Sequence, residues 1–350
     1  MKISQIMLGK GFGGAERYFL DLCLALADAG HSIQAICHPN FVALPALRAN
    51  GKIRLDTVLA WGKWDPLAPW KIHRMLLDFK PDVVQAHLAR GALIAGKAAR
   101  RSSFPLVVKT HNYVNLKYYK YVDHFISTTR DQFKYLKSHG IPENRISVIP
   151  NFSRIPAAET VRARSSGPLV FTAYGRMVRK KGFDLLLQAF AMLVSAGFNT
   201  RLLVGGDGPE RTRLEKQAHD LGISQHVEFA GWISDVQLFL SRGDVFVLPS
   251  RDEPFGIAVL EAMAAGMPII ATRTMGPMEI LNQGAGYLVA PNSADALLSA
   301  MKTSIENPGL SESFAIAALD LYKTRFHESI VVPQLLSLYR KVMEEKSQKI

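Results

Sequence analysis

The sequence predicts an α/β protein built from two doubly wound domains that face each other across a cleft. Three observations support this prediction: the length of the chain, the alternation of short apolar runs with helix-like stretches, and a gap without apolar period between two such series. With 350 residues, 48% of them hydrophobic, the chain is too long for one typical domain and can bury sizeable cores. Near-continuous apolar strands separated by helices are typical of parallel sheets covered on both faces.

The first series of strands lies in residues 1–150. A helix is predicted over Ala15–Ala29, where Gly30 supplies the stop signal. The runs predicted to form strands are short, apolar and separated by longer segments: Lys2–Leu8, Ser32–Cys37, Asp82–His87, Leu106–Lys109 and His124–Ser127.

A second series of the same kind follows in the C-terminal half. The intervening segment, Phe152–Pro168, contains prolines and a glycine but no apolar period, so it is predicted to be a linker. We therefore expect one domain over residues 1–155 and another over 156–327, with a last helix within 328–350 that packs back on the first domain. The strands predicted in the second series are Leu169–Ala173, Arg201–Val204, Val227–Phe229, Asp244–Leu248 and Pro268–Ala271.

The positive charge of the chain is concentrated in its first half. The net charge is +12, and residues 1–150 hold 21 Lys and Arg against 10 Asp and Glu, a balance of +11. Such asymmetry indicates an anionic partner of this half, which could be a nucleic acid, an acidic membrane face or a phosphorylated acceptor.

Cysteine content and hydropathy bear on the cellular compartment. The two cysteines, Cys23 and Cys37, favour a reduced protein over one built on disulfides. No apolar run approaches the roughly 18 residues of a membrane-spanning helix, and the N-terminus is too short and polar for a secretory signal. We therefore expect a cytoplasmic protein.

A glycine-rich loop, Gly9–Gly14, follows the first predicted strand and opens the first helix. Its letters satisfy G-x-G-x-x-G, the dinucleotide-binding fingerprint, which also requires an acidic residue about 20 positions later. No Asp or Glu occurs between Asp28 and Asp56, so the dehydrogenase interpretation fails. Glycines at a helix N-terminus still let backbone amides approach a phosphate, and a plain strand-to-helix turn is the alternative.

Two loops of the second domain combine glycines with charged residues. Gly175–Gly182 carries Arg176 and Lys181, which can converge on one anion, although a basic loop of this kind is often an ordinary solvated surface. Gly205–Glu210 again joins a strand to a helix, and its glycines permit either a close approach to a ligand or a plain tight turn.

Glu253 and Glu261 flank the start of a predicted helix that ends at Gly266. Pro254 suits the first helical turn, and backbone amides within Phe255–Ile257 are then free to bind an anion. At a helical rise of about 1.5 Å per residue, the two acids would lie about 12 Å apart. Paired glycosidase carboxylates lie about 5–9.5 Å apart, so this wider spacing better suits the opposite ends of a long ligand.

These motifs resemble, in order and spacing, the retaining GT-B glycosyltransferases, and above all glycosyltransferase family 4. The similarity runs from about Ile3 to Gly286. The Glu-x7-Glu element together with the Arg and Lys pair is specific to this resemblance, whereas the glycine loops alone are not. The motifs that carry it are Gly13–Glu16, Gly175–Gly182, Gly205–Pro209, Phe229–Gly231 and Glu253–Ala262.

The resemblance implies a role for each site residue. Glu253 would bind donor-sugar hydroxyls, Glu261 the ribose, and Arg176 and Lys181 the diphosphate. His111 matches the histidine that the family places beside the reacting sugar, although a histidine at a strand end is by position alone more often structural. Glu253 and His111 are thus the expected catalytic residues. The further donor-binding residues are Gly13, Gly14, Gly206, Phe255, Gly256 and Ile257, and the acceptor-side residues are His87, Lys109 and Asn112.

The resemblance also implies the reaction. A hexose-type sugar would pass from a nucleotide diphosphate donor, a UDP-sugar before a GDP-sugar, to a glycan or lipid-linked acceptor in lipopolysaccharide or cell-surface polysaccharide synthesis, with its anomeric configuration retained. No Asp-x-Asp triplet occurs, so we expect neither an essential metal nor another cofactor. One departure concerns Met275–Glu279, where the family often has Gly-Gly before its last acidic residue; the contact of this loop with the donor is therefore open.

Two other functions are open from the sequence alone. One is a different enzyme on the same scaffold, such as a nucleotide-sugar epimerase or a phosphorylase. The other is a nucleic-acid-binding protein, which the pI of 9.7 suggests, although no zinc pattern, RNA-recognition signature or evident helix-turn-helix supports it.

Aromatic and basic residues are interleaved in two segments of the first domain. Tyr and Trp beside Lys suit a membrane interface, where the rings lie at headgroup depth and the cations meet anionic lipid. We therefore expect peripheral docking on an anionic inner membrane face, with an ordinary basic surface as the alternative. The segments are Lys109–Tyr121 and the stretch with Trp61, Lys63, Trp64, Trp70, Lys71 and Arg74.

Overall fold

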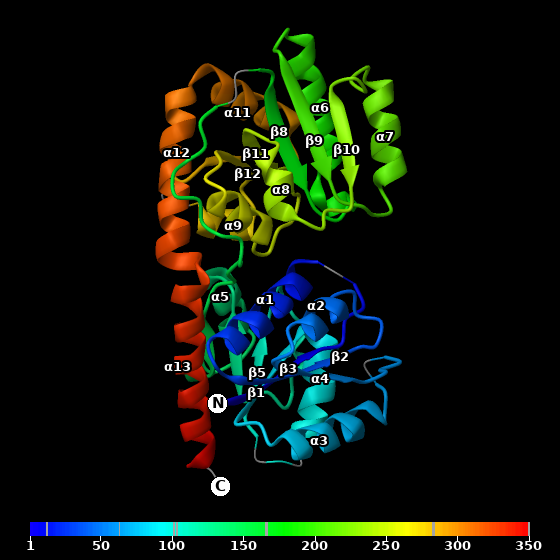
Figure 1. Ribbon diagram of the computed structural model, residues 1–350, viewed down its shortest axis with the longest axis vertical. Helices are drawn as coiled ribbons and strands as arrows, with labels where there is room; N and C mark the ends of the chain where they lie inside the picture. Colours follow the sequence, from blue (N-terminus) through cyan, green and yellow to red (C-terminus); the bar gives the residue numbers. More distant parts are fainter. Residues whose placement is uncertain are drawn as a thin grey trace. The chain divides into compact units, whose positions relative to one another are not determined.

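The computed structural model describes residues 1–11, 13–62, 64–100, 102, 104–164, 167–281 and 284–348. The chain divides into two compact units (Figure 1). Unit 1 comprises Met1–Phe152 and the C-terminal segment that begins at Glu328, and unit 2 comprises Ser153–His327. The sequence predicts these boundaries after residues 155 and 327; the structure has them after residues 152 and 327.

Unit 1 is built on a seven-stranded parallel sheet of order β3-β2-β1-β4-β5-β6-β7. The five runs predicted as strands in this half all form strands, and β3 and β7 are additional. Both additions are edge strands, one with alternating polar residues and one only three residues long, so neither shows the long apolar run of a central strand. The strands are β1 (Lys2–Met7), β2 (Ser32–Cys37), β3 (Ile53–Thr57), β4 (Val83–His87), β5 (Leu106–Lys109), β6 (His124–Ser127) and β7 (Ile146–Val148).

Helices cover both faces of this sheet (Figure 1). The last of them, α13, runs through Pro333 and belongs to unit 1, where Tyr339 is buried and Lys346 Nζ lies 2.8 Å from the Asp123 carboxylate. The helices are α1 (Gly14–Asp28), α2 (Leu44–Ala49), α3 (Ala68–Phe79), α4 (Leu88–Ala99), α5 (Arg130–Ser138) and α13 (Glu328–Ser347), with short 3₁₀ turns η1 (Leu116–Tyr118) and η2 (Glu143–Arg145).

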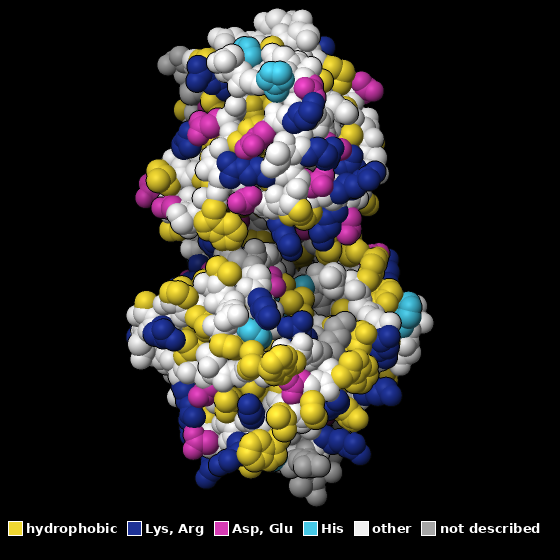
Figure 2. All heavy atoms as spheres, turned by 90° about the vertical axis from the view of Figure 1, so that its right-hand side faces the viewer, with side chains coloured by type: hydrophobic (Ala, Val, Ile, Leu, Met, Phe, Trp, Pro, Cys, Tyr) yellow, Lys and Arg dark blue, Asp and Glu magenta, His cyan; other side chains and the backbone are white. Residues whose placement is uncertain are grey.

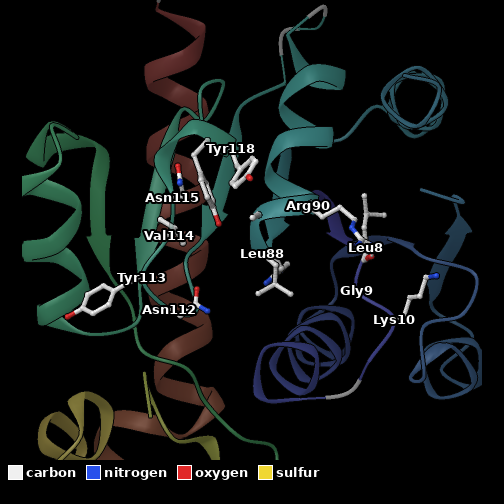
Figure 3. A pocket seen from close by; sticks show the side chains of 14 residues that line it. Leu8, Gly9, Lys10, Leu88, Arg90, Asn112, Tyr113, Val114, Asn115 and Tyr118 are labelled. Carbon is white, nitrogen blue, oxygen red and sulfur yellow. Dashed lines mark hydrogen bonds between the residues drawn. The ribbon is translucent and has the colours of Figure 1, made fainter. Parts of the chain in front are cut away.

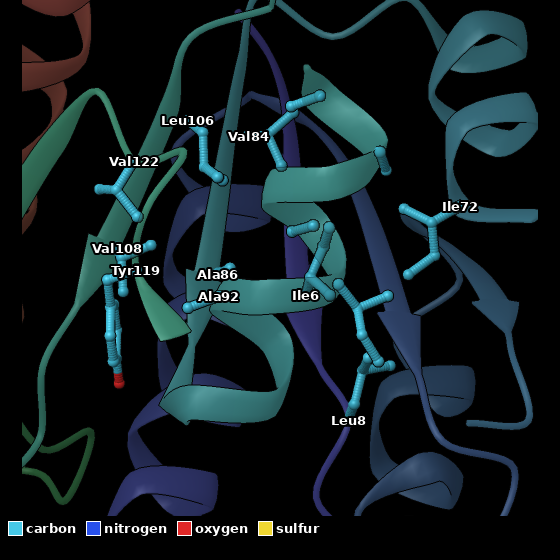
Figure 4. Packing of buried hydrophobic residues seen from close by; sticks show 14 of the residues in the cluster. Ile6, Leu8, Ile72, Val84, Ala86, Ala92, Leu106, Val108, Tyr119 and Val122 are labelled. Atoms are coloured by element: carbon cyan, nitrogen blue, oxygen red, sulfur yellow. The ribbon is translucent and has the colours of Figure 1, made fainter. Parts of the chain in front are cut away.

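Both faces of the central strands in unit 1 bury apolar and polar side chains. Side chains alternate along a strand, so Ile6 and Leu8 share one face, where they pack with Ala92 of α4 (Figure 4). The opposite face of the same strands carries Gln5 and Gln85, which are register partners and fully buried. The face with Ile6 also buries Ser4, whose hydroxyl donates to Gln34 Oε1 at 2.6 Å, so both faces of the sheet hold buried polar groups.

Unit 2 is built on a six-stranded parallel sheet of order β10-β9-β8-β11-β12-β13. All five predicted runs form strands, and the three-residue edge strand β13 is additional. No helix among the described residues is both long enough and apolar enough to cross a membrane. The strands are β8 (Leu169–Tyr174), β9 (Thr200–Gly205), β10 (Val227–Gly231), β11 (Val245–Leu248), β12 (Ile269–Thr272) and β13 (Tyr287–Val289). The helices are α6 (Phe183–Ser195), α7 (Arg211–Asp220), α8 (Val236–Ser241), α9 (Ile257–Ala264), α10 (Met275–Ile280), α11 (Ala294–Glu306) and α12 (Pro308–Leu321), with the 3₁₀ turn η3 (Arg179–Lys181) and the π-helical turn η4 (Tyr322–Phe326).

The segment Phe152–Pro168, predicted to be a linker, is for the most part packed on unit 2. From Ser153 onward it belongs to unit 2. The Ala158 amide donates to the carbonyl of Ala264 at 2.7 Å, and Ile155 is buried. This segment is held to the end of α9 by backbone hydrogen bonds rather than by a regular series of apolar side chains. Backbone hydrogen bonds leave no pattern in the sequence, so this packing could not be predicted. Ser165 and Ser166 lie outside the described residues.

Candidate functional site

Each sheet reverses the direction in which its strands are added. In unit 2 the chain builds outward from β8 to β10 and then returns to place β11 beside β8. In unit 1 β4 likewise returns to lie beside β1. Ligands of open α/β sheets bind outside the carboxyl ends of the strands at such a switch point. The loops after β8 and β11, and those after β1 and β4, are therefore the places to expect a ligand.

The loops after β8 and β9 are joined by backbone hydrogen bonds. The Gly175 amide donates to the Gly205 carbonyl at 3.1 Å, and the Met177 amide donates to the Asp207 carbonyl at 2.8 Å. Gly206 has a φ of +113°, and a Cβ at this position would lie 2.0 Å from the Gly175 carbonyl oxygen. Both the left-handed backbone and the close approach require glycine. The second glycine loop of unit 2 thus supports the basic loop beside it.

Several polar side chains meet beside the switch point of unit 2. The Lys181 ammonium pairs with the Glu253 carboxylate, and their side chains are only 21% and 10% exposed. The Ser250 hydroxyl also donates to Glu253, at 3.4 Å. Glu261 in α9 is 3% exposed and accepts a hydrogen bond from the Tyr174 hydroxyl at the end of β8. The structure therefore joins Lys181 to Glu253, two residues expected to bind different parts of one ligand.

Arg176 differs from Lys181 in its surroundings. Its side chain is exposed and has no ion pair or hydrogen bond with the residues that the structure describes. Besides Arg176 and Lys181, this loop carries the exposed cations Arg179 and Lys180.

Within the same described ranges, no group of three or more His, Cys, Asp or Glu side chains is placed to hold a metal ion. The expectation of a metal-independent reaction stays a prediction.

The helix after Glu253 begins later than predicted. α9 starts at Ile257, and Gly256 before it has a φ of +98°. Pro254 therefore lies outside the helix rather than in its first turn. The separation of about 12 Å, which assumed a continuous helical rise, does not apply to Glu253 and Glu261. Amides at the beginning of α9 still have no acceptor within the helix, as at any helix start.

The segment that departs from the glycosyltransferase pattern lies against this turn. The Gly276 amide in α10 donates to the Glu253 carbonyl at 3.0 Å. A Cβ on Gly276 would lie 1.9 Å from the carbonyl oxygen of Phe255, which is itself buried. The Met275–Glu279 segment therefore holds the backbone that presents Glu253, whether or not it also meets a ligand.

Unit 1 holds a cavity of about 660 Å³ at its own switch point (Figure 3). One side is formed by the end of β1 and the start of α4, and the other by the segment that follows β5. His87 and Asn112, both predicted on the acceptor side, line it. Lys10 and Arg90 are its cationic lining residues, and its described lining includes no acidic side chain. The cavity therefore suits a polar ligand with an anionic group.

His111 is bonded to His87, which lines the cavity. The Nε2 atom of His111 lies 3.1 Å from His87 Nδ1, and the two rings stack with centroids 5.4 Å apart. Burial, followed by the charge of Lys109, lowers the pKa of His87 to about 3. Burial, followed by the charges of His87 and Lys109, lowers the pKa of His111 well below its usual range. Both rings are therefore neutral at pH 7.

The assignment of Lys109 to the acceptor side is wrong. Its side chain is fully buried, and burial lowers its pKa well below the usual value. Lys109 Nζ donates to the carbonyls of Ile149 and Pro150, both at 2.9 Å, and to the Tyr18 hydroxyl at 3.1 Å. These three acceptors satisfy the three donors of the ammonium. Lys109 thus fixes the segment after β7 to the sheet and presents nothing to a ligand.

The first glycine loop carries a side-chain contact that its glycine pattern does not reveal. Gly13 caps α1, and its amide donates to Glu16 Oε2 at 3.1 Å. Gly14 is the first residue of the helix, and Phe12 lies outside the described residues. A phosphate at this helix start would compete with the Glu16 carboxylate for the Gly13 amide. The predicted phosphate contact at Gly13 and Gly14 stays a prediction.

Sequence reasoning missed four residues that contact the predicted site residues. Tyr174 bonds Glu261, and its one signal is its place at a strand end directly before Gly175. Gln5 and Gln85 interrupt otherwise apolar strands, and Tyr339 occupies a core position of the last helix. Each of these signals fits ordinary core packing equally well. The hydrogen-bond partners of these four residues are therefore known only from the fold.

Comparison with known families covers most of the chain. Residues 12–153 match the family model described as "Glycosyltransferase Family 4", and residues 157–320 match "Glycosyl transferases group 1". These segments lie on either side of the boundary between the two units.

Individual relatives and solved structures agree with this match. A lipopolysaccharide core biosynthesis glycosyltransferase of Rhizobium meliloti, LpsD, is 31% identical over 97% of this chain and 98% of its own length. A second from the same organism, LpsE, is 33% identical over 95% of this chain and 94% of its own. A glycosyltransferase of Rickettsia africae superposes with a TM-score of 0.83 at 20% identity, covering 98% of each chain. HepE of Anabaena in complex with UDP gives 0.84 at 20% identity, over 97% of this chain and all of that one.

Proposed function

Since the chain belongs to the glycosyltransferases that join a family 4 segment to a group 1 segment, and has their GT-B fold, we propose that it transfers a hexose-type sugar from a nucleotide diphosphate with retention of anomeric configuration. The proposed donor is a UDP-sugar, with a GDP-sugar as the second choice. The proposed acceptor is a glycan or a lipid-linked glycan in lipopolysaccharide or other cell-surface polysaccharide synthesis.

The cluster at the switch point of unit 2 carries this proposal. A nucleotide-sugar offers hydroxyl groups at both ends and a diphosphate between them. Glu253 and Glu261 supply two largely buried carboxylates that can accept from hydroxyls, while Lys181 and Arg176 supply cations for the diphosphate. Glu261 is held by Tyr174 and is assigned to the ribose, and Glu253 is assigned to the transferred sugar.

The proposed reaction follows from the charge that develops in the transition state. As the glycosidic C–O bond breaks, the sugar becomes oxocarbenium-like and the departing diphosphate gains negative charge. Lys181, Arg176 and the amides at the start of α9 would stabilise that charge. The acceptor hydroxyl would attack the same face, and the departing phosphate oxygen would take its proton. Configuration is then retained without a nucleophile from the protein.

The relatives support the choice of donor and acceptor. HepE of Anabaena is described in complexes with UDP and with UDP-glucose, which favours a UDP-sugar here. Both Rhizobium meliloti relatives are named for lipopolysaccharide core biosynthesis, which favours an acceptor of that kind.

The unit 1 cavity is the proposed acceptor site. His87 and Asn112 line it, and His111, bonded to His87, is proposed to meet the reacting sugar. Lys10 and Arg90 line the same cavity without an acidic neighbour in its described wall, which favours an acceptor that bears a phosphate or carboxylate.

The division of labour between the two acids predicts different losses. Glu261→Ala is expected to weaken UDP binding roughly tenfold or more, because a charge-assisted hydrogen bond contributes about 1.5–3 kcal/mol. Glu253→Ala is expected to leave UDP affinity nearly unchanged and to reduce sugar transfer, because its assigned partner is absent from UDP. Calorimetric titration with UDP, followed by a transfer assay, measures both effects.

Glu228→Ala is the matched control, since Glu228 is an exposed carboxylate on β10 of the same unit. It should change neither UDP affinity nor transfer. Equal loss of UDP affinity in the Glu253 and Glu261 variants would contradict the assigned roles. If the unmodified protein binds none of UDP, GDP and ADP, the proposed function itself is wrong.

A second proposal concerns how unit 1 meets a membrane-borne acceptor. Four large apolar side chains, here termed the aromatic patch, are strongly exposed around one loop, and Trp61 and Trp64 are 88% and 67% exposed. Asp65 is buried below them, and its carboxylate accepts backbone amides, including that of Trp61 at 3.0 Å. The loop is thus held so that its aromatic residues face solvent. The aromatic patch consists of Trp61, Trp64, Leu67 and Trp70.

Cations surround the aromatic patch. The Arg74 guanidinium lies 5.1 Å from the Trp70 ring, and the Lys97 ammonium lies 5.3 Å from the Trp64 ring. Hydrophobic side chains lie among Lys and Arg side chains on the face of unit 1 in Figure 2. The second predicted segment contributes less, because Tyr119 and Lys109 are buried, and Lys63 lies outside the described residues.

The proposed docking predicts binding that depends on lipid charge and salt. Anionic vesicles should retain the protein, neutral vesicles should not, and high salt should release it, since each surface Lys or Arg contributes about 1 kcal/mol. Replacing Trp61 and Trp64 together by Ser should weaken co-sedimentation, whereas Trp232→Ser, at an exposed Trp of unit 2, should not. Equal pelleting with both lipids, or none with either, would contradict the proposal and favour a soluble acceptor.

A further inference from the structure

Five polar side chains connect the C-terminal helix to His111 inside unit 1. Tyr339 comes from α13, Gln5 from β1, and Gln85 and His87 from β4, and all four are fully buried. Gln5 and Gln85 are register partners on adjacent strands, and His87 follows Gln85 by two positions on the same strand face. These four residues and His111 are termed the Tyr339 network.

The Tyr339 hydroxyl determines how both glutamines are turned. It donates its single proton to Gln85 Oε1 at 2.6 Å and accepts from Gln5 Nε2 at 3.1 Å. The remaining amide atoms, the oxygen of Gln5 and the nitrogen of Gln85, then face His87 Nε2 at 3.0 and 3.2 Å. Without the hydroxyl, neither amide would have a preferred orientation at this end.

The orientation of Gln5 determines where His87 carries its proton. A carbonyl oxygen can only accept, so the 3.0 Å contact from His87 Nε2 to Gln5 Oε1 requires a proton on Nε2, whereas the Gln85 amide nitrogen at 3.2 Å can only donate and would require a lone pair there. The two contacts cannot both be hydrogen bonds. We assign the hydrogen bond to the shorter one, and Gln85 Nε2 then lies beside His87 without bonding to it. A neutral imidazole has one proton, which leaves Nδ1 as an acceptor. His87 Nδ1 lies 3.1 Å from His111 Nε2 and therefore accepts a proton from it.

The same reasoning extends to His111. As a neutral ring with its proton on Nε2, it has a lone pair on Nδ1. His111 Nδ1 is buried and has no hydrogen-bond partner among the described residues. The Tyr18 ring packs edge-on against His111, with centroids 5.5 Å apart, and so restrains the ring from the other side.

We propose that Tyr339 is a positioning residue, which through Gln5 and His87 holds His111 in the tautomer with its proton on Nε2. His111 Nδ1, which is buried in this structure, then carries a lone pair that can accept a hydrogen bond from a sugar hydroxyl once that hydroxyl reaches it. This inference rests on the role of His111 in the proposed function. The C-terminal helix thereby takes part in the reaction through Tyr339, although the Tyr339 side chain itself contacts no substrate.

Nitrogen-15 NMR of the imidazole rings tests the tautomer without any substrate. The unmodified protein should show His111 protonated on Nε2, with the resonance assigned from a His111→Gln variant. Tyr339→Phe should shift His87 and His111 toward a mixture of tautomers. Tyr322→Phe is the matched control, because Tyr322 is also fully buried and donates to the carbonyls of Ser153 and Ile155 in unit 2, whereas His87 and His111 belong to unit 1. It should leave both histidine signals unchanged.

Kinetics supply the second readout. Tyr339→Phe should lower kcat roughly tenfold and leave the KM for the nucleotide-sugar unchanged, because it disturbs an interaction that acts in the chemical step rather than in donor binding. His111 protonated on Nδ1, or signals unaffected by Tyr339→Phe, would overturn the inference. A His111→Gln protein with full activity would instead refute the role of His111 in the proposed function, which separates the two failures.

Discussion

Replacing Lys181 by alanine is expected to lower kcat/KM for sugar transfer about 10- to 150-fold. This corresponds to roughly 1.5–3 kcal/mol of transition-state stabilisation, the scale of a hydrogen bond to a charged group. Two effects combine, because the diphosphate loses a cation and the Glu253 carboxylate, 10% exposed, loses its ion-pair partner. Arg176→Ala should fall at the lower end of this range, because it involves the first effect alone. Steady-state kinetics with saturating acceptor measure both losses.

Lys180 supplies the control for Lys181. It is the adjacent lysine of the same turn and is exposed, so Lys180→Ala should leave kcat/KM close to its original value. The Lys181→Ala/Glu253→Ala double variant should lose less than the two single losses together, since the paired residues share one interaction. Full kcat/KM in the Lys181→Ala protein would refute its assignment to the diphosphate.

A large loss of stability is expected from Gly182→Ala. Gly182 has a φ of +69°, and a Cβ there would lie 2.0 Å from the Pro249 carbonyl oxygen. The left-handed backbone costs about 1–2 kcal/mol for an L-residue, and the steric clash about 1–3 kcal/mol more. The free energy of unfolding should therefore fall by roughly 2–5 kcal/mol, as measured by urea denaturation.

Gly222→Ala separates the two contributions. Gly222 has a φ of +71°, close to that of Gly182, but a Cβ there would meet no other heavy atom of the described residues within 4 Å. It should therefore show the backbone cost alone. Equal destabilisation by the two substitutions would mean that the loop after β11 moves away from Gly182 without cost, contrary to the close packing of Gly182 against Pro249.

The fold could be predicted because its signals are local. Central strands such as Leu106–Lys109 are short apolar runs, and helices end at residues such as Gly30, so strand positions follow from the letters. The edge strands β3, β7 and β13 were missed because an edge strand needs neither length nor a continuous apolar run. The start of α9 was placed too early because the left-handed Gly256 is not distinguishable from a helical glycine in the sequence.

Candidate site residues could be predicted only where the type of the residue, such as a carboxylate or a cation, by itself indicates what it can bind. Lys181, Glu253 and Glu261 could be singled out as candidates, but the pairing of Lys181 with Glu253 could not be predicted. Lys109 illustrates the limit, since its aromatic and basic neighbours suggested a surface. Its actual acceptors lie about forty positions away in the chain, at Ile149 and Pro150. Contacts of that separation are set by strand register, which no local pattern encodes.

The place of α13 has a consequence for how the protein is made. A ribosome delivers all seven strands of unit 1 first, then the whole of unit 2, and only afterwards Tyr339 and Lys346. Until then the amides of Gln5 and Gln85 lack the hydroxyl that they share, and an unsatisfied buried polar group costs about 1–3 kcal/mol. Domains usually complete folding in the order of their synthesis. In this chain the half that is translated first reaches its final stability last, after its neighbour is already complete.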